Sequence, residues 1–134
     1  MNLNQVTLPA RDVAESVAFF RRLGTAAGIV QIVDAPHYAR FECGDGGATF
    51  SVHRAEAVAP HGVVVYFEVA ELDAVVAALQ AAGIAFTQLP RDEPWLWREA
   101  RLRDPSGNEL CLYRAGENRR HPPWRVAEPH STPR

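Results

Sequence analysis

Four side chains are the candidates for transferring protons or attacking electrophiles: His53, Glu99, Glu109 and Cys111. Imidazole and carboxylate groups act as general acids and bases. A thiol becomes a nucleophile when a base or a cation beside it lowers its pKa, and Arg101 and His53 are the neighbours available to Cys111. The alternative interpretation is structural. In that case Cys111 is a small side chain on the floor of a cleft, and His53 is a polar residue lining the cleft or its rim.

Three of these side chains belong to one predicted β-hairpin. Apolar and polar residues alternate along residues 99–103 and again along residues 109–113, which is the period of a half-buried strand. The sequence D-P-S-G-N at 104–108 is typical of a turn, because Pro fixes φ and Gly accepts a positive φ. Leu110 and Leu112 are expected to face the core. The opposite face should therefore carry Glu109, Cys111 and Tyr113.

An internal repeat organises the chain around this hairpin. A shift of 59 residues carries Val13, Val17, Phe20 and Gly24 of one predicted helix onto Leu72, Val76, Leu79 and Gly83 of a second. Each helix follows one strand and precedes three, so each half is predicted as β-α-β-β-β. We expect the first strand to end at Pro9, Asp12 to cap the first helix and Gly24 to end it. The other strands are predicted at residues 28–33, 38–43, 48–53, 61–69, 84–88, 97–103 and 108–114.

The strand, the D-P-x-G-N turn and the strand that follows resemble the closing hairpin of the vicinal-oxygen-chelate superfamily. This superfamily includes glyoxalase I, bleomycin-resistance proteins, fosfomycin-modifying enzymes and extradiol dioxygenases. The resemblance covers about residues 2–115. It implies an α+β fold of two βαβββ modules, residues 1–58 and 59–115, whose curved mixed sheets form a cleft. A Pro/Arg-rich C-terminal arm, residues 116–134, follows them.

In this fold the cleft is lined by the strand faces opposite the helices, so strand parity predicts its side chains. The residues that we expect to contact a ligand are Gln5, Arg40, Glu42, Ser51, His53, Val64, Tyr66, Trp95, Trp97, Arg101, Cys111 and Tyr113. Polar and aromatic side chains dominate this set, which favours a small polar ligand over a lipid.

Two tryptophans enter the last hairpin at positions i and i+2 and would share one face of an extended segment. Trp95 and Trp97, with Tyr66 and Tyr113, would then form a stacking wall for a planar ligand. Bleomycin-type binders, which the chain resembles, hold a planar cationic drug in this way. The acidic side chains expected on the same faces favour a cation: Glu42, Glu68, Glu99 and Glu109. The alternative is that one tryptophan plugs the core or a dimer seam.

Metal-dependent members of the superfamily carry their ligands on the first and last strands of each module. The resemblance places Gln5, Ser51, Val64 and Cys111 at these positions. Val64 has no donor atom and Cys111 replaces the usual Glu, whereas a catalytic ion needs about three protein ligands. We therefore expect no cofactor and no metal at the inherited positions. The alternative is a relocated divalent site built from His53, Glu42, Glu109 and Cys111.

The composition narrows the functional classes. The chain has 134 residues and a formal net charge of -2, which provides no general attraction to nucleic acid or to an anionic membrane. No apolar run is long enough to span a bilayer, and the N-terminus lacks the pattern of a signal peptide. Two cysteines are too few for a disulfide scaffold. We expect a cytoplasmic protein.

The arm contains four prolines and is predicted to be extended, pinned to the domain by Trp124. The alternative is that it closes a cleft or crosses to a second subunit.

The function predicted from these observations is binding of a small organic molecule in the cleft. The resemblance also implies a homodimer, and the modules could pair within one chain or between two chains. Two alternatives stay open. One is an enzyme of the superfamily, a lyase, isomerase or dioxygenase, with a relocated metal or with metal-free acid–base chemistry. The other is a partner-binding module that uses the arm.

Overall fold

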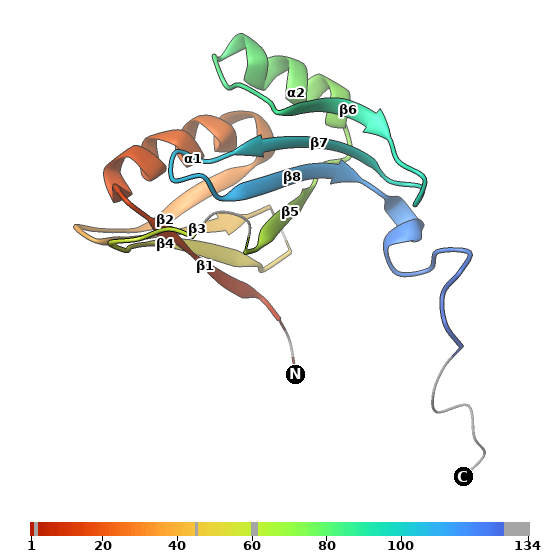
Figure 1. The fold of residues 1–134 in the computed structure, drawn as a ribbon, viewed down its shortest axis with the longest axis horizontal. Coiled ribbons are helices and arrows are strands. Elements are labelled where there is room, and N and C mark those ends of the chain that lie inside the picture. The colour runs from red at the N-terminus through yellow and green to blue at the C-terminus, as the bar shows by residue number, and fades with distance from the viewer. Residues whose placement is uncertain (2, 45, 60–61, 128–134) are drawn as a thin grey trace.

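The structure is a computed structural model that describes residues 1, 3–44, 46–59 and 62–127 (Figure 1). The first module consists of β1 (Gln5–Ala10), α1 (Val13–Ala27), β2 (Ile29–Ala35), β3 (Tyr38–Cys43) and β4 (Thr49–Arg54). The second consists of β5 (Val64–Glu68), α2 (Leu72–Ala81), β6 (Gln88–Asp92), β7 (Arg98–Arg103) and β8 (Glu109–Arg114). A single 3-10 turn, η1 (Gly116–Arg119), begins the arm. The predicted pair of βαβββ units is confirmed.

Each module forms one four-stranded mixed sheet. Sheet A has the order β1-β4-β3-β2 and sheet B the order β5-β8-β7-β6. In both, the first strand pairs in parallel with the last, and the remaining pairs are antiparallel. The bounds of the last two strands in each sheet differ by 60 residues, so the repeat extends through the hairpins.

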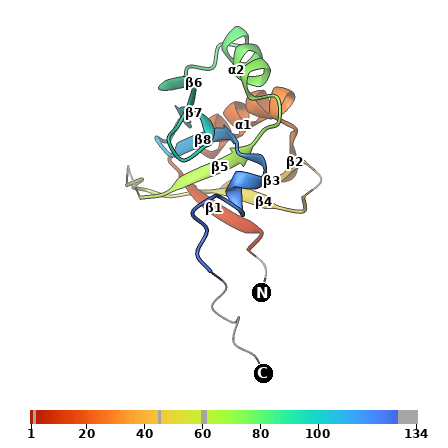
Figure 2. The ribbon, with the colours of Figure 1, turned by 90° about the vertical axis from the view of Figure 1, so that its right-hand side faces the viewer.

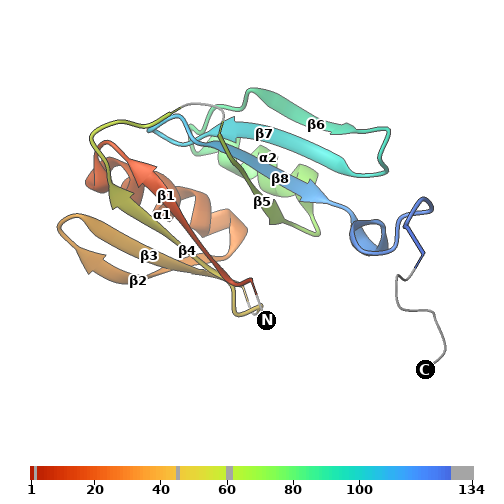
Figure 3. The same cartoon turned by 60° about the horizontal axis from the view of Figure 1, so that its bottom comes forward.

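The two modules share one hydrophobic core, built from the helix-covered faces of both sheets. Phe20 of α1 packs against Phe41 and Phe50, and Phe50 contacts Phe67 of the second module at a centroid distance of 5.4 Å. Figure 2 shows both helices in the angle between the two sheets. The other face of each sheet therefore points outward, and Figure 3 shows both of these uncovered faces in front of the helices.

The first helix begins as predicted but ends later. Asp12 is the N-cap and accepts a hydrogen bond from the backbone N–H of Glu15 at 3.1 Å. The helix continues through Gly24 to Ala27, and Gly28 is the left-handed C-cap with φ 75°. A Cβ atom at Gly24 would overlap the carbonyl oxygen of Ile29. The prediction that Gly24 ends the helix is wrong, because this glycine is required by close packing rather than by a turn.

Two strand boundaries also differ from the predictions. The strand predicted at 84–88 lies at Gln88–Asp92, because Ile84 is buried in the core and its N–H bonds the carbonyl oxygen of Leu79 at the end of α2. Pro9 lies inside β1, where it pairs with His53. Proline is tolerated there because β1 is an edge strand. His61, which opens the predicted fifth strand, lies outside the described residues.

The arm is attached through its first turn. The Glu68 carboxylate accepts hydrogen bonds from the backbone N–H groups of Ala115 and Gly116, and the Trp97 indole donates to the carbonyl oxygen of Asn118 at 3.4 Å. Trp124 is 56% exposed, so the prediction that it pins the arm is wrong. Residues 128–134 of the predicted arm lie outside the described residues. No helix in the described part of the chain is both long and apolar enough to cross a membrane.

Candidate functional site

An aromatic cluster lies on the uncovered face of sheet B. Trp97 and Tyr113 stack with a centroid distance of 4.5 Å and an interplanar angle of 16°. Tyr66 meets both rings edge to face, at 5.9 Å and 5.8 Å. Tyr66 lies on β5, Tyr113 lies near the end of β8, and Trp97 directly precedes β7. Strand parity therefore placed these three residues on the correct face. Tyr66 is 45% exposed and Trp97 is half-buried, whereas Tyr113 is only 6% exposed.

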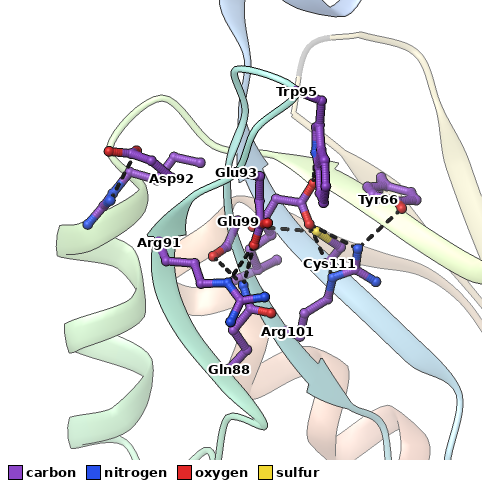
Figure 4. A network of polar contacts seen from close by, with 11 residues as sticks. Tyr66, Gln88, Arg91, Asp92, Glu93, Trp95, Glu99, Arg101 and Cys111 are labelled. Atoms are coloured by element: carbon purple, nitrogen blue, oxygen red, sulfur yellow. Dashed lines mark hydrogen bonds and ion pairs between the residues drawn. The ribbon is translucent and has the colours of Figure 1, made fainter.

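A charged group lies beside the aromatic cluster on the same face (Figure 4). The guanidinium of Arg101 bonds Glu99 Oε1 at 2.9 Å and Glu109 Oε2 at 3.0 Å. It also lies 5.5 Å from the centroid of the Tyr66 ring. Two carboxylates therefore share the Arg101 guanidinium, and Arg103 lies 3.8 Å from the other oxygen of Glu109. Glu99 is only 2% exposed, whereas the Glu109 side chain keeps 27% of its surface in the solvent.

Cys111 lies beneath this charged group and is fully buried. Burial raises the pKa of its thiol to about 12, with a further rise from Glu99, and these effects outweigh the opposing charge of Arg101. A thiol with this pKa is protonated at neutral pH and is a poor nucleophile. The arrangement agrees with the structural interpretation of Cys111, in which it fills the floor of the face.

Trp95 does not join the aromatic stack. Leu96 has a left-handed φ of 68°, which turns the chain between the two tryptophans. The Trp95 indole N–H instead donates to Glu99 Oε2 at 2.6 Å (Figure 4). The condition for a common stacking wall, an extended segment, is not met, because the segment is a turn. Trp95 covers the Glu99 carboxylate, and Trp97 supplies the stacking surface.

A second polar network supports the turn that carries Trp95. The Glu93 carboxylate, whose side chain is 8% exposed, pairs with Arg91 at 2.6 Å. Gln88 donates to the same carboxylate at 3.3 Å and to the backbone carbonyl of Glu99 at 3.2 Å. Sequence reasoning had not assigned these residues to the site. Gln88 and Arg91 lie on β6, whose position was predicted incorrectly, and Glu93 directly follows this strand.

The uncovered face of sheet A carries a separate hydrogen-bond network. Ser51 is completely buried, accepts from Gln5 Nε2 at 2.7 Å and bonds the Tyr38 hydroxyl at 2.6 Å. Arg40 donates to the Tyr38 hydroxyl at 2.8 Å, and Thr49 bonds the Gln5 carbonyl oxygen. The hydrogen bond with Ser51 is the main reason that the pKa of Tyr38 lies below its ordinary value. Tyr38 was missed as a site residue, although it alternates in register with Arg40.

The structure does not bring together the residues of the relocated metal site. Glu42 and His53 are exposed on sheet A, whereas Glu109 and Cys111 lie on sheet B. His53 contacts the Tyr38 ring at a centroid distance of 6.2 Å. Among residues 1, 3–44, 46–59 and 62–127, no three His, Cys, Asp or Glu side chains form a group that could hold a metal ion.

The four inherited ligand positions do not fit a divalent metal either. The amide of Gln5 and the hydroxyl of Ser51 already bond each other and their neighbours. Val64 has no donor atom, and the buried Cys111 thiol would have to lose a proton whose pKa is raised to about 12. Gln5 and Ser51 are polar side chains on the uncovered face of sheet A, and Val64 and Cys111 are side chains on the uncovered face of sheet B.

Comparisons with known proteins agree with this architecture. A glyoxalase/bleomycin resistance protein/dioxygenase from Nocardioides is 24% identical, with a TM-score of 0.73 over 95% of this chain and 90% of that chain. A bleomycin-binding protein in complex with bleomycin is 20% identical, with a TM-score of 0.68 over 85% and 98% of the two chains. Lactoylglutathione lyase from Agrobacterium tumefaciens is 19% identical, with a TM-score of 0.68 over 84% and 92%. At these identities the likeness shows the fold alone.

No curated protein matches the chain. A sequence model of one superfamily matches residues 2–112, which include both βαβββ modules up to the last strand. On this match, the chain belongs to the glyoxalase/bleomycin resistance protein/dioxygenase superfamily.

Proposed function

We propose that the uncovered face of sheet B binds a small planar organic cation, without a metal ion, in a cleft that a second copy of the chain completes. The observation that carries this proposal is the stacked pair Trp97–Tyr113 beside the charged group of Glu99, Arg101 and Glu109. Stacked aromatic rings provide a flat apolar surface. The Glu109 carboxylate, whose side chain keeps 27% of its surface in the solvent, is available beside them to a positively charged ligand.

The position of the two uncovered faces supports a binding site shared between two copies. Both faces point outward from the common core (Figure 2). A ligand site normally buries most of its ligand. In a homodimer, sheet A of one copy would cover sheet B of the other and contribute Gln5, Tyr38 and Arg40 to the opposite wall.

Binding without a metal is supported by the engagement of the inherited ligand positions. Gln5 and Ser51 satisfy one another, Val64 is an aliphatic side chain, and Cys111 is a buried thiol. The stacking surface and the carboxylates require no metal for their own interactions. The bleomycin-binding protein with the same fold is a relative whose name also indicates binding of a small molecule.

Calorimetric titration tests the proposal. Protein freed of metal with a chelator is titrated with proflavine, a planar cation, and with acridone, a planar neutral compound. We expect proflavine to bind more tightly than acridone, and addition of zinc, manganese or nickel to leave its affinity unchanged. Trp97→Leu should weaken proflavine binding about tenfold, because the stacking surface is lost. Trp124→Leu is the matched control on the arm and should leave the affinity unchanged. Equal binding by the two variants, or binding only after metal is added, would overturn the proposal.

Subunit mixing tests whether the cleft is shared. Trp97→Leu removes the stacking surface of sheet B, and Thr7→Trp blocks the uncovered face of sheet A at an exposed position of β1. A heterodimer of the two variants has one intact cleft if sheets of different copies combine, so mixing should restore one proflavine site per dimer. No recovery on mixing would show that each cleft is formed within one chain.

A further inference from the structure

One end of the seam between the two modules is closed by the turn of the last hairpin. The Asn108 side chain donates to the carbonyl oxygen of Pro9 at 2.9 Å, and Ser106 Oγ accepts from the backbone N–H of Arg11 at 2.9 Å. The Asp104 carboxylate holds this turn together by accepting from the N–H groups of Ser106 and Asn108. Polar side chains of the second module therefore fasten it to the β1–α1 connection of the first.

The internal repeat predicts where the equivalent contact would lie at the other end of the seam. The 60-residue shift between the hairpins carries the positions of Asp104, Ser106 and Asn108 onto Gly44, Gly46 and Ala48. The 59-residue shift between the first strands carries Pro9 onto Glu68. Gly44 and Gly46–Ala48 carry no polar side chain, so these residues cannot make the fastening contacts that Ser106 and Asn108 make. Asp45 lies outside the described residues.

At this second end the structure contains a cavity of about 540 Å³. Its walls are Gly44, Gly46 and Ala48 on one side and Glu68 and Val69 on the other, which are the positions that the repeat identifies. The volume lies within the range of small-molecule sites, roughly 300–1,000 Å³. The cavity therefore lies where the repeat would place a second copy of the Ser106 and Asn108 contacts, and where these contacts are missing.

The floor of the cavity is apolar. It is formed by the edge of the common core, including the Phe50–Phe67 pair together with Ala27 and Val65. Ala27, Val65 and Phe67 are only partly buried although they pack against the core. These side chains offer an apolar surface that a ligand would remove from water, with a gain of about 25 cal/mol for each Å².

The rim of the cavity carries one carboxylate and one guanidinium. Glu68 Oε2 accepts from the N–H groups of Ala115 and Gly116, and Glu68 Oε1 faces Arg119. Arg119 lines the same rim, is 48% exposed and lies 3.8 Å from Glu68, which is a long and weak ion pair. A guanidinium has five N–H donors in a fork that matches a carboxylate. Arg119 is therefore able to bind a ligand carboxylate.

We propose that this seam cavity is a second binding site for a small aromatic carboxylate. It shares Tyr66 and Tyr113 with the aromatic cluster of sheet B, but neither Trp97 nor the charged group of Glu99, Arg101 and Glu109 lines it. The aromatic ring lies on the apolar floor beside Phe50 and Phe67, and the carboxylate bonds Arg119 at the rim. This proposal does not depend on the function proposed above, because the cavity floor is formed by Phe50, Phe67, Ala27 and Val65, and Trp97 does not line the cavity.

Two-dimensional amide NMR with 2-naphthoate as the probe tests this site. We expect saturable shifts at the amides of Gly44, Gly46 and Val65–Val69, without shifts at the Trp95 and Trp97 indole N–H groups. The neutral analogue 2-naphthamide should bind about tenfold more weakly, because it cannot form the charge-assisted bond. Shifts centred on the indole groups, or no saturable shifts, would overturn the proposed site. Equal affinity for the two probes would overturn its preference for anions.

Three variants assign the contacts. Ala48→Asn introduces the counterpart of Asn108 and should close the cavity, weakening 2-naphthoate binding at least about tenfold. Arg119→Gln should weaken 2-naphthoate about tenfold and leave 2-naphthamide unchanged. Arg120→Gln, one residue away, is the matched control and should bind both probes as the unmodified protein does. Unchanged naphthoate affinity in a well-folded Ala48→Asn variant, or equal losses in the two arginine variants, would contradict the assignment.

Discussion

The indole N–H of Trp95 donates a 2.6 Å hydrogen bond to the carboxylate of Glu99, a side chain that is 2% exposed. Arg101 bonds the other oxygen of the same carboxylate at 2.9 Å. A buried charge with two such partners is stable only while both are present, because an uncompensated charge in the protein interior is costly. This relationship makes Glu99 the residue on which the charged group of sheet B depends.

We expect Glu99→Ala to lower the free energy of unfolding by about 3–5 kcal/mol, because it leaves a polar void and releases Trp95 and Arg101 from a buried partner. Glu109→Ala is the matched control, since Glu109 bonds the same guanidinium from a more exposed position. Its loss should be about 1 kcal/mol or less. Urea unfolding of both variants measures the difference, and equal losses would show that the burial of Glu99 has no energetic consequence.

The raised pKa of Cys111 predicts a pH dependence of stability. The folded-state pKa of about 12 lies above the ordinary value of 9.0, so the folded state holds the thiol proton more tightly than the unfolded chain does. This contribution is complete below pH 9 and is lost as the pH rises from about 9 to about 12.

Cys111→Ala should therefore lose stability less steeply than the unmodified protein over this alkaline range, as measured by urea unfolding at each pH. Cys43→Ala is the comparison: burial raises the pKa of that thiol too, so its removal should change the alkaline loss in the same direction. At pH 8 the Cys111 thiol should react with iodoacetamide far more slowly than a free cysteine. Rapid alkylation of folded protein at Cys111 would contradict the buried, protonated thiol.

Replacing Gly24 by Ala should change the stability of the protein in the direction opposite to that of an ordinary helix position. In an ordinary helix interior, replacing Gly by Ala stabilises the helix by about 1 kcal/mol. Gly24→Ala should instead destabilise the protein by about 2–4 kcal/mol, because the new methyl group would overlap the backbone of Ile29.

Gly28→Ala is the comparison, since its Cβ would meet no atom within 4 Å and its cost comes only from the left-handed φ of 75°. That cost should be about 1 kcal/mol. Thermal unfolding of both variants ranks the two effects, and a stabilising Gly24→Ala would show that the helix and β2 are not in close contact there.

Asn108 is expected to stabilise the closed end of the module seam. Asn108→Ala removes the bond to the Pro9 carbonyl oxygen and one bond within the turn, and should lower the free energy of unfolding by about 1–3 kcal/mol. Asn118→Ala is the control, because the contacts described for Asn118 use its backbone. Hydrogen exchange at β1 should accelerate only in the Asn108 variant. Equal exchange rates in both would contradict the fastening role.

Most of the fold was predictable because it is expressed in local patterns. The period of two in the strands, the helical spacing of Val13 and Phe20, and the D-P-S-G-N turn each depend on residues close together in the chain. The same parity placed Tyr66, Trp97 and Tyr113 on one face before any contact was known. The homodimer, the cytoplasmic location, the absence of a cofactor and the alternative roles as an enzyme or a partner-binding module stay predictions.

What the sequence by itself determined is the order of the elements and the face on which each strand side chain lies, since both follow from backbone geometry over a few residues. Only the tertiary structure decided that Gly24 serves close packing, that the turn at Leu96 separates Trp95 from Trp97, and that the two uncovered faces point outward. These properties depend on atoms far apart in the chain, which meet only when the helix-covered faces of both sheets are buried in one core.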